Sequence, residues 1–409
     1  MPGATTLYFP EVGPSWEDWV QVVNVGTEST KVLAIARHAG NGQALWSEEK
    51  ELSPFECWTP NVEAVKQNSS MQFTADQPIV AERHMHGGTN ILDFVGAAVE
   101  YETVGQRLFF PELVAGAQDW FRFLNVGEAD ALINIVLRDR NGNVLRQIHR
   151  NVPPLHCWDI NEGGMGNVTG TVEVQSSQPI VGERHLHYQG GKTSVGQFGQ
   201  VISDAPKTLY FPEVGPAWHD WVIIVNVGQE DAKISMVARE DGTGNPVWSI
   251  EQNRLRPFEC WTPNMESIKI KSSVEARGDQ PIIAERHMHS GTSIIDLPGA
   301  SAEGGHVGRR LFFPEVYTGA KDWFRFLNVD EADALINIVI RNRNGDIIRQ
   351  LHNSVRPFCC WDVDDRRMGN VRGTVEVQSS QAIVGERHMH YTGRHKGAVV
   401  GAYGVVIGE

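Results

Sequence analysis

The chain repeats itself four times. The tripeptide Phe-Pro-Glu begins at Phe9, Phe110, Phe211 and Phe313, at steps of 101, 101 and 102 residues. Each copy continues with Asp-Trp, Asn-Val and Cys-Trp and closes with Glu-Arg-His-x-His. Self-similarity at a fixed period is the signature of tandem structural units. The sequence therefore predicts four modules of about a hundred residues each.

The copies are of two kinds. The first and third share Gly-Pro-x-Trp, at Gly13 and Gly215, whereas the second and fourth share Asp-Trp-Phe-Arg-Phe-Leu-Asn-Val. We name these kinds A and B, so the order is A-B-A-B, as two successive duplications would produce. Boundaries are predicted near Glu102, Asp204 and His306, where Gly, Pro and polar residues concentrate. The predicted modules are 1–102, 103–204, 205–306 and 307–409.

Apolar residues alternate with a period of two between Gly, Pro, Asn and Asp residues, and stripes with helical spacing are missing. Asn141-Gly142 is typical of a hairpin turn, because both positions tolerate positive φ. In the second copy the predicted strands are 108–111, 120–126, 131–138, 144–149, 155–159, 170–175 and 180–187. Such a number of short strands favours an all-β protein of four immunoglobulin-like or fibronectin-like β-sandwich modules over propeller blades, which have about four strands each.

The composition is that of an ordinary globular protein, with 41% hydrophobic and 21% charged residues. A formal charge of -14 argues against nucleic acid or an anionic membrane as a partner, because both need a basic surface. No apolar run approaches the ~20 residues that span a bilayer, so membrane insertion is not expected. We expect an extracellular or cell-surface location if an export signal has been removed, and a cytoplasmic one otherwise.

The sequence of the repeat is similar to that of a known family of repeat modules. Leu-Tyr-Phe-Pro-Glu at Leu7, Val-Val-Asn-Val-Gly at Val22 and Gln-Pro-Ile-Val-Ala-Glu-Arg at Gln77 resemble a repeat module of uncharacterised function in bacterial cell-surface proteins, with the pattern YFAEG…NPG…PIVAER. The resemblance implies an all-β fold and a surface context. It gives no guidance on the His-x-His and Cys residues, where this sequence departs from the pattern.

The closing Glu-Arg-His-x-His segments hold eight of the fifteen histidines. On a strand, Glu82, His84 and His86 share one face while Arg83 and Met85 point the other way. Two histidines so spaced can chelate one metal, but Glu82 is about 13 Å from His86 along the strand, so further ligands must come from a neighbouring strand, module or water. The candidate metal ligands are His84, His86, His185, His187, His287, His289, His388, His390, Glu82, Glu183, Glu285 and Glu386.

Cys57 is a candidate for a further ligand, and a mixed nitrogen and sulfur set would favour zinc or copper. The alternative is that these histidines form a polar strand face bonded to neighbouring loops. The cysteines occur once per copy, apart from the extra Cys359, which argues against a disulfide scaffold and favours small buried hydrophobes. The repeated positions are Cys57, Cys157, Cys260 and Cys360.

Four of the twelve tryptophans stand outside the repeated Asp-Trp and Cys-Trp pairs, and two of these four are candidates for ligand binding. Trp16 and Trp218 follow Gly-Pro in a predicted loop and occur only in the A copies. An exposed loop tryptophan is a candidate platform for a sugar ring or for an apolar side chain of a protein partner.

The glutamate of Phe-Pro-Glu could serve acid–base catalysis, but it recurs in every copy, whereas an active site normally occurs once. We interpret Glu11, Glu112, Glu213 and Glu315 as structural partners of the repeated Arg83, Arg184, Arg286 and Arg387. Signatures of hydrolases, metalloproteases and nucleotide-binding enzymes are missing. The leading hypothesis is a non-catalytic, multivalent surface-binding or self-assembling protein for carbohydrate or protein partners. The alternatives are a metal-binding protein or metalloenzyme and a structural spacer.

Overall fold

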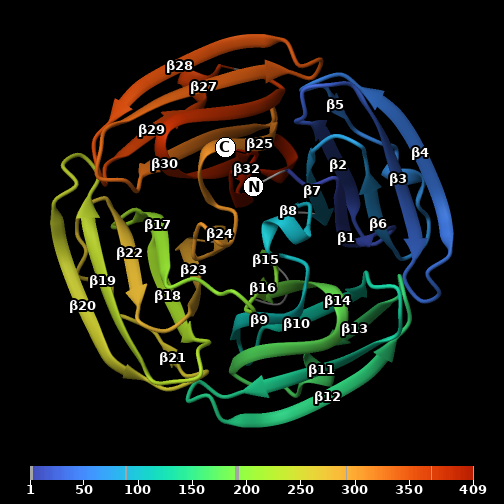
Figure 1. Cartoon of the computed structure of the whole chain (residues 1–409), viewed down its shortest axis with the longest axis horizontal. Helices are drawn as coiled ribbons and strands as arrows, with labels where there is room; N and C mark the ends of the chain where they lie inside the picture. Colours follow the sequence, from blue (N-terminus) through green and yellow to red (C-terminus); the bar gives the residue numbers. More distant parts are fainter. Residues whose placement is uncertain (1–2, 88–89, 189–192, 292, 370, 409) are drawn as a thin grey trace.

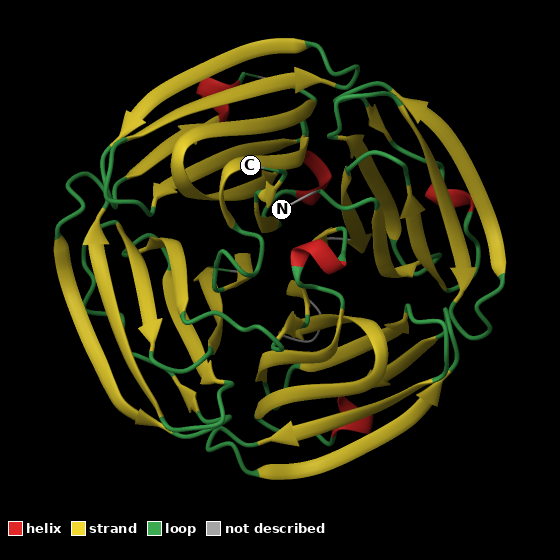
Figure 2. Cartoon of the chain, viewed as in Figure 1, coloured by secondary structure: helices red, strands yellow, loops and turns green. Residues whose placement is uncertain are grey.

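The computed structural model describes residues 3–87, 90–188, 193–291, 293–369 and 371–408. Within these residues strands dominate, and helical structure is limited to short segments (Figure 2). The prediction of an all-β protein is confirmed. The helical segments are α1 (Glu162–Met165), α2 (Asp365–Met368) and the 3-10 turns η1 (Val62–Ala64), η2 (Val99–Tyr101) and η3 (Gly393–His395).

The four repeats lie around a common centre, each as one group of strands (Figure 1). The first repeat has β1 (Thr6–Val12), β2 (Glu17–Asn24), β3 (Thr30–His38), β4 (Ala44–Leu52), β5 (Cys57–Trp58), β6 (Ser69–Thr74), β7 (Ile79–Gly87) and β8 (Asn90–Val95). The second has β9 (Gly105–Leu113), β10 (Gln118–Asn125), β11 (Ala131–Arg138), β12 (Val144–Val152), β13 (Cys157–Asn161), β14 (Gly170–Tyr188), β15 (Thr193–Phe198) and β16 (Gln200–Val201).

The second half of the chain follows the same plan. The third repeat has β17 (Thr208–Val214), β18 (His219–Asn226), β19 (Ala232–Glu240), β20 (Pro246–Leu255), β21 (Cys260–Trp261), β22 (Ser272–Gly278), β23 (Ile282–Ser290) and β24 (Ser293–Pro298). The fourth has β25 (Val307–Val316), β26 (Ala320–Asn328), β27 (Ala334–Asn342), β28 (Ile347–Val355), β29 (Cys360–Asp364), β30 (Gly373–Tyr391), β31 (Val399–Tyr403) and β32 (Val405–Val406).

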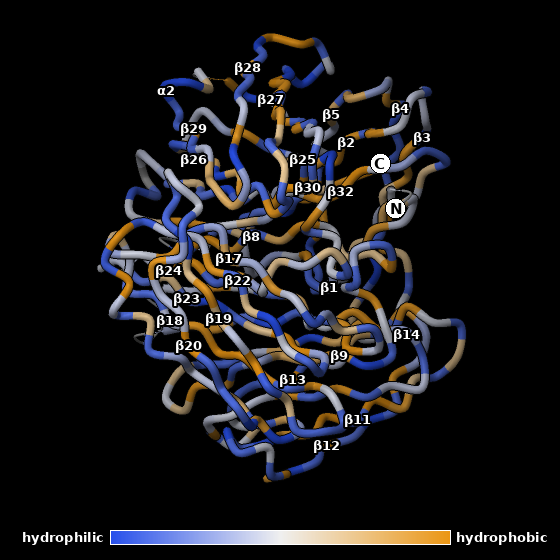
Figure 3. Tube along the Cα trace, turned by 60° about the vertical axis from the view of Figure 1, so that its left-hand side comes forward, coloured by the Kyte–Doolittle hydropathy of each residue, from blue (hydrophilic) through white to orange (hydrophobic). Residues whose placement is uncertain are grey.

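The strands of an A repeat form two antiparallel sheets. In the first repeat the orders are β1-β6-β3-β4 and β5-β2-β7-β8, and the third repeat has the same orders. Leu7 and Phe9 from one sheet and Val20 and Val22 from the other belong to one hydrophobic core. The alternation of apolar residues therefore places one face of each sheet in a shared core. The outermost strands β4, β12, β20 and β28 carry both hydrophilic and hydrophobic residues (Figure 3), and most of their residues are exposed.

The B repeats differ because one long strand serves both sheets. β14 has 19 residues; its first half pairs with β11 and its second half with β10 and β15. The sequence predicted two strands here, 170–175 and 180–187, since Ser-Ser-Gln-Pro reads as a break. The strand instead continues through these residues, with a register shift against β9 between Gln175 and Ile180. Because the register changes there, one strand can pass from the first sheet to the second.

Backbone hydrogen bonds close the four repeats into a ring. In every repeat the N–H of the cysteine in the Cys-Trp pair donates to a carbonyl of the preceding repeat, and the bond from Cys57 to Arg343 joins the first repeat to the fourth at 2.8 Å. The others are Cys157 to Ala39, Cys260 to Arg140 and Cys360 to Asp241. Both chain ends lie near the centre (Figure 1), where Val405 and Ile407 join the core of the first repeat. The repeats are thus parts of one closed assembly.

The strands that carry Glu-Arg-His-x-His lie near the centre of this ring. β7, β14, β23 and β30 each pair with an innermost strand, β8, β15, β24 or β31. The innermost strands contact one another around the axis. This placement brings the histidine motifs close to the boundaries between repeats.

Candidate metal centres at the repeat boundaries

The two faces of each motif strand face two different repeats. On β7, Glu82 and His84 point towards the fourth repeat, where His84 Nε2 lies 2.9 Å from Glu315 Oε2. Arg83 points the other way and donates to Glu183 of the second repeat at 3.1 Å. The predicted alternation along the strand is therefore present, and it is used for contacts between repeats.

The repeated arginines form a closed circle of ion pairs. Each donates to the motif glutamate of the next repeat and to the backbone carbonyl of Phe-Pro-Glu in its own repeat. The pairs are Arg83 with Glu183, Arg184 with Glu285, Arg286 with Glu386 and Arg387 with Glu82. We had expected the Phe-Pro-Glu carboxylates to be the partners of these arginines. Each arginine instead donates to the backbone carbonyl of the Phe-Pro-Glu glutamate, and the carboxylate of that glutamate lies beside a histidine of the next repeat.

One carboxylate–histidine cluster results at every boundary. It joins the Phe-Pro-Glu glutamate of one repeat to the motif glutamate and first histidine of the next, and all its members are buried. The clusters are Glu11, Glu183 and His185; Glu112, Glu285 and His287; Glu213, Glu386 and His388; and Glu315, Glu82 and His84. The sequence identified the motif residues but not the third member, because the neighbour of each repeat is set by ring closure.

Two boundaries lead from an A repeat to a B repeat, between repeats one and two and between repeats three and four. At both, the Phe-Pro-Glu glutamate is too far from the histidine for a hydrogen bond. Glu11 Oε2 lies 3.7 Å from His185 Nε2, and Glu213 Oε2 lies 3.7 Å from His388 Nδ1. Both oxygens are buried and have no hydrogen-bond donor within the described residues; Glu112 Oε2, at a B-to-A boundary, also has none but lies closer to its histidine, 2.7 Å from His287 Nε2. The motif glutamate is close in both cases, with Glu183 Oε1 at 2.7 Å from His185 Nε2. These clusters thus leave a buried carboxylate oxygen beside an imidazole.

At the two B-to-A boundaries the histidine has polar partners on both ring nitrogens. His84 Nε2 contacts Glu315 and Glu82, while the hydroxyl of Tyr391 lies 2.9 Å from Nδ1. Trp19 Nε1 also donates to Glu315 at 2.9 Å. Tyr188 takes the place of Tyr391 in the equivalent cluster around His287, at 3.5 Å. An imidazolium, with two N–H donors, fits this arrangement.

The pKa shifts of the histidines at the B-to-A boundaries agree with a protonated imidazole there. Burial lowers the pKa of His84 and His287, but nearby carboxylates, first Asp93 and Asp296, raise it well above its ordinary value. These aspartates occur only in the A repeats and bond to Arg387 and Arg184, both at 2.8 Å. Burial raises the pKa of both aspartates as well. Protons on these histidines and aspartates can therefore offset the negative charge of the carboxylates at the B-to-A boundaries.

The second histidine of each motif lies outside these three-residue clusters. Burial, followed by the neighbouring first histidine, lowers the pKa of His187 and His390 to about 4, and His289 behaves in the same way. His86 contacts the ring of Trp19 at 4.8 Å. Neutral imidazoles of this kind remain able to bind a metal or a ligand.

Trp16 and Trp218 lie at the A-to-B boundaries rather than on a fully exposed loop. Trp16 is half-buried, with its ring 5.9 Å from that of His185 and stacked at 6.3 Å on that of His187. Trp218 repeats these contacts with His388 at 5.8 Å and with His390 at 6.4 Å. The structure thus brings the predicted tryptophans to the predicted histidines.

A cavity of about 320 Å³ opens at the first A-to-B boundary. Glu11, Trp16, Trp120, His185 and His187 line it. Trp120, from one of the repeated Asp-Trp pairs, has its ring 4.7 Å from that of His185. Candidate metal ligands and aromatic side chains therefore line one cavity.

The cysteines take no part in the four clusters that the described residues form. All are free thiols and none is exposed, which agrees with small buried side chains. Burial raises the pKa of Cys57, Cys157 and Cys260 to about 12, so these thiols are poor metal ligands at neutral pH.

Comparisons with known proteins give no family. No family model and no curated protein matches the chain. Among solved structures, a glycoside hydrolase family 32 protein from Bifidobacterium adolescentis is 8% identical over 93% of this chain and 99% of that one, with a TM-score of 0.18. A Bacteroides uniformis beta-glucuronidase is 12% identical over 58% of this chain and 27% of that one, with a TM-score of 0.12. Likenesses this weak carry no argument about fold or function.

Proposed function

We propose that this chain is a non-catalytic, bivalent metal-binding protein with one divalent cation at each A-to-B boundary. The observation that carries the proposal is the pair of buried carboxylate oxygens, on Glu11 and Glu213, that have no hydrogen-bond donor and lie beside an imidazole. Buried polar atoms are almost always satisfied, and a buried carboxylate without a donor, beside an imidazole and a second carboxylate, forms a ligand set that suits a divalent cation.

The charge at these boundaries supports the same conclusion. Arg83 contacts two buried carboxylates, on Asp18 and Glu183, and donates to the backbone carbonyl of Glu11, whose carboxylate lies near a second guanidinium, that of Arg122. Burial raises the pKa of Asp18 to about 6, so it is largely ionised at neutral pH. The excess of negative charge is costly in a buried site, and a divalent cation removes it.

The ligand set favours zinc. Two carboxylates and one imidazole leave one position open for water or a ligand in a four-coordinate site. With no thiolate in the clusters of the described residues, the case for copper is weaker than the sequence suggested. The other histidines of the motifs remain candidate metal ligands. At His84 and His287, however, the neighbouring carboxylates and tyrosine favour a protonated imidazole over a bound metal.

Glu11 and His185 also line the aromatic cavity at the first boundary, and the tryptophan–histidine contacts recur at the second. We propose that carbohydrate or a protein side chain binds there, on Trp16 and Trp218. Two equivalent sites on one rigid ring would provide avidity for a repetitive surface. Because the resemblance in the repeats points to bacterial surface proteins, we propose an extracellular location. No helix among the described residues has the length and apolar character to cross a membrane.

We further propose that each repeat is one β-sandwich module, in A-B-A-B order with the boundaries expected from the sequence. The shared core of the two sheets in an A repeat supports this arrangement.

The experiment is metal analysis of protein purified without an affinity tag. We expect about two equivalents of zinc per chain, and we expect Glu11→Gln with Glu213→Gln to remove both. Glu112→Gln with Glu315→Gln is the matched control, since it changes the same motif position at the B-to-A boundaries. Metal-free protein that takes up no zinc or copper on titration, or equal loss in the control, would refute the proposal.

A further inference from the structure

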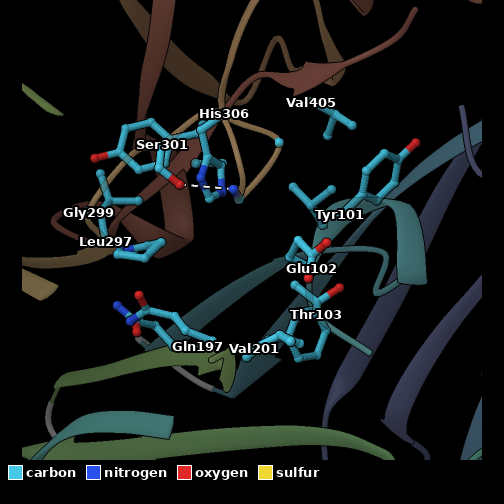
Figure 4. A pocket seen from close by; sticks show the side chains of 18 of the residues that line it. Tyr101, Glu102, Thr103, Gln197, Val201, Leu297, Gly299, Ser301, His306 and Val405 are labelled. Carbon is cyan, nitrogen blue, oxygen red and sulfur yellow. Dashed lines mark hydrogen bonds between the residues drawn. The ribbon is translucent and has the colours of Figure 1, made fainter. Parts of the chain in front are cut away.

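A second cavity lies on the axis of the ring, at the junctions between repeats. Its volume is about 160 Å³, and all four repeats contribute to its wall. Figure 4 shows Tyr101, Glu102 and Thr103 on one side, Leu297, Ser301 and His306 on another, and Gln197 and Val201 below them. A cavity of this size matches one that holds benzene, so its ligand has on the order of ten heavy atoms or fewer.

The charged side chains of this cavity are all acidic. Asp93 and Asp296 are bonded to arginines, but Glu102, Asp204 and Glu303 form no ion pair within the described residues. Lysine and arginine do not occur among the described lining residues. Asp204 and Glu303 are exposed, whereas Glu102 is half-buried, so the negative charge extends from the mouth inwards. A cation is attracted to such a cavity.

Aromatic rings supply the rest of the wall. Phe94, Tyr101, Phe198 and Tyr403 line the cavity, and Phe94 packs on Phe198 with ring centroids 5.1 Å apart. Rings together with carboxylates form the usual recognition set for organic ammonium groups, because the ring faces are negative and the alkyl groups are apolar.

Glu102 stands at a position that suits glycine better. It has φ 52° and ψ 35°, in the left-handed region. The equivalent residue in the third repeat, five positions after the alanine that bridges Tyr210, is Gly305, with φ 69°. A side chain in this conformation is unfavourable, whereas glycine adopts it freely. The first repeat therefore places a carboxylate at the axis against the local backbone preference.

The loops that carry the wall are held by hydrogen bonds. Thr103 bonds twice to Ala98, and the N–H of Val201 donates to the carbonyl of Glu102 at 3.2 Å. Across the cavity, the N–H of Gly304 donates to Ser301 Oγ at 2.9 Å, the bond drawn in Figure 4. His306 Nδ1 is buried and lacks a hydrogen-bond partner among the described residues. The cavity is thus formed in advance and retains an unsatisfied polar atom.

We propose that the axial cavity binds a small organic cation, an amine or quaternary ammonium compound with a compact apolar body. The carboxylate of Glu102 pairs with the cationic group, the aromatic rings enclose its alkyl substituents, and His306 accepts or donates one hydrogen bond to a hydroxyl of the ligand. This site shares no lining residue named above with the proposed metal sites at the A-to-B boundaries.

Calorimetric titration of the full chain with choline tests the proposal. We expect choline to bind, and we expect the neutral alcohol in which carbon replaces the choline nitrogen to bind roughly tenfold more weakly or not at all. Glu102→Gln keeps the size of the side chain and its backbone conformation but removes the charge, so it should weaken choline binding roughly tenfold.

Glu51→Gln, on the exposed strand β4, is the control for charge and should bind choline as the parent does. The proposal is wrong if choline does not bind, if choline and its neutral analogue bind equally, or if Glu102→Gln leaves choline affinity unchanged. Thermal unfolding of each variant separates lost binding from lost folding.

Discussion

The hydroxyl of Tyr391 lies 2.9 Å from Nδ1 of His84, and Nε2 of the same ring contacts two carboxylates of different repeats. The ring therefore joins the fourth repeat to the first through both of its nitrogens. A protonated imidazole can donate on both sides, and in that state the tyrosine oxygen accepts the Nδ1 hydrogen.

This geometry gives a pH prediction. The folded-state pKa of His84 and His287 lies well above that of the unfolded chain, so their contribution to stability is complete below about pH 6.5 and is lost as pH rises through the folded-state pKa. The free energy of unfolding of the parent should fall more steeply above pH 7 than that of the His84→Gln, His287→Gln variant. Urea unfolding across this range measures it, and parallel curves would contradict it.

Zinc should stabilise the folded chain through the A-to-B boundaries. At a free zinc concentration a hundred times the dissociation constant, each site adds about 2.7 kcal/mol to the free energy of unfolding. We expect the melting temperature of metal-depleted protein to rise on zinc addition and the Glu11→Gln, Glu213→Gln variant to show no rise. An equal rise in both would place the stabilising zinc elsewhere.

Removing one arginine of the circle should be strongly destabilising. Arg184→Met leaves Glu285 and Asp296 buried without their counter-charge, and we expect a loss of about 3–5 kcal/mol in the free energy of unfolding. Adding Glu285→Gln should restore part of it, because the uncompensated charge is removed. Arg107→Met is the control: Arg107 is more than a third exposed in its pair with Glu173 and should cost about 1 kcal/mol or less. Chemical denaturation measures all three.

Glu102→Gly should raise stability while it removes a carboxylate from the axial cavity. Relief of the left-handed conformation is worth about 1–2 kcal/mol, and the extra freedom of glycine in the unfolded chain offsets roughly 0.5–1 kcal/mol of it. We expect a net gain of between zero and about 1.5 kcal/mol by urea unfolding. Gly305→Ala, at the equivalent position, should be destabilising; a loss in the Glu102→Gly variant would show that its side chain supports the fold.

The sequence predicted the local structure of the motif but not its partners. Period-two alternation correctly separated Glu82 and His84 from Arg83, because the face of a strand depends only on local geometry. The third member, Glu315, could not be found, since it comes from the far end of the chain and meets His84 only when the ring closes. Trp16 was singled out by its absence from the B copies, although its contact with His187 depends on the same closure.

The A-B pair should assemble by itself into the same ring. Residues 1–204 contain one complete A-to-B boundary and, when cut from the chain, expose the two surfaces that form B-to-A boundaries. These surfaces carry buried charges that need their partners, such as Arg184 without Glu285 and Glu82 without Arg387. Two copies can satisfy both surfaces through a two-fold axis, because the second half of the chain repeats the first. We therefore expect residues 1–204 to form a dimer with the strand content of the full chain. Light scattering after size exclusion and circular dichroism measure both, and a folded monomer would show that the repeats do not require the ring.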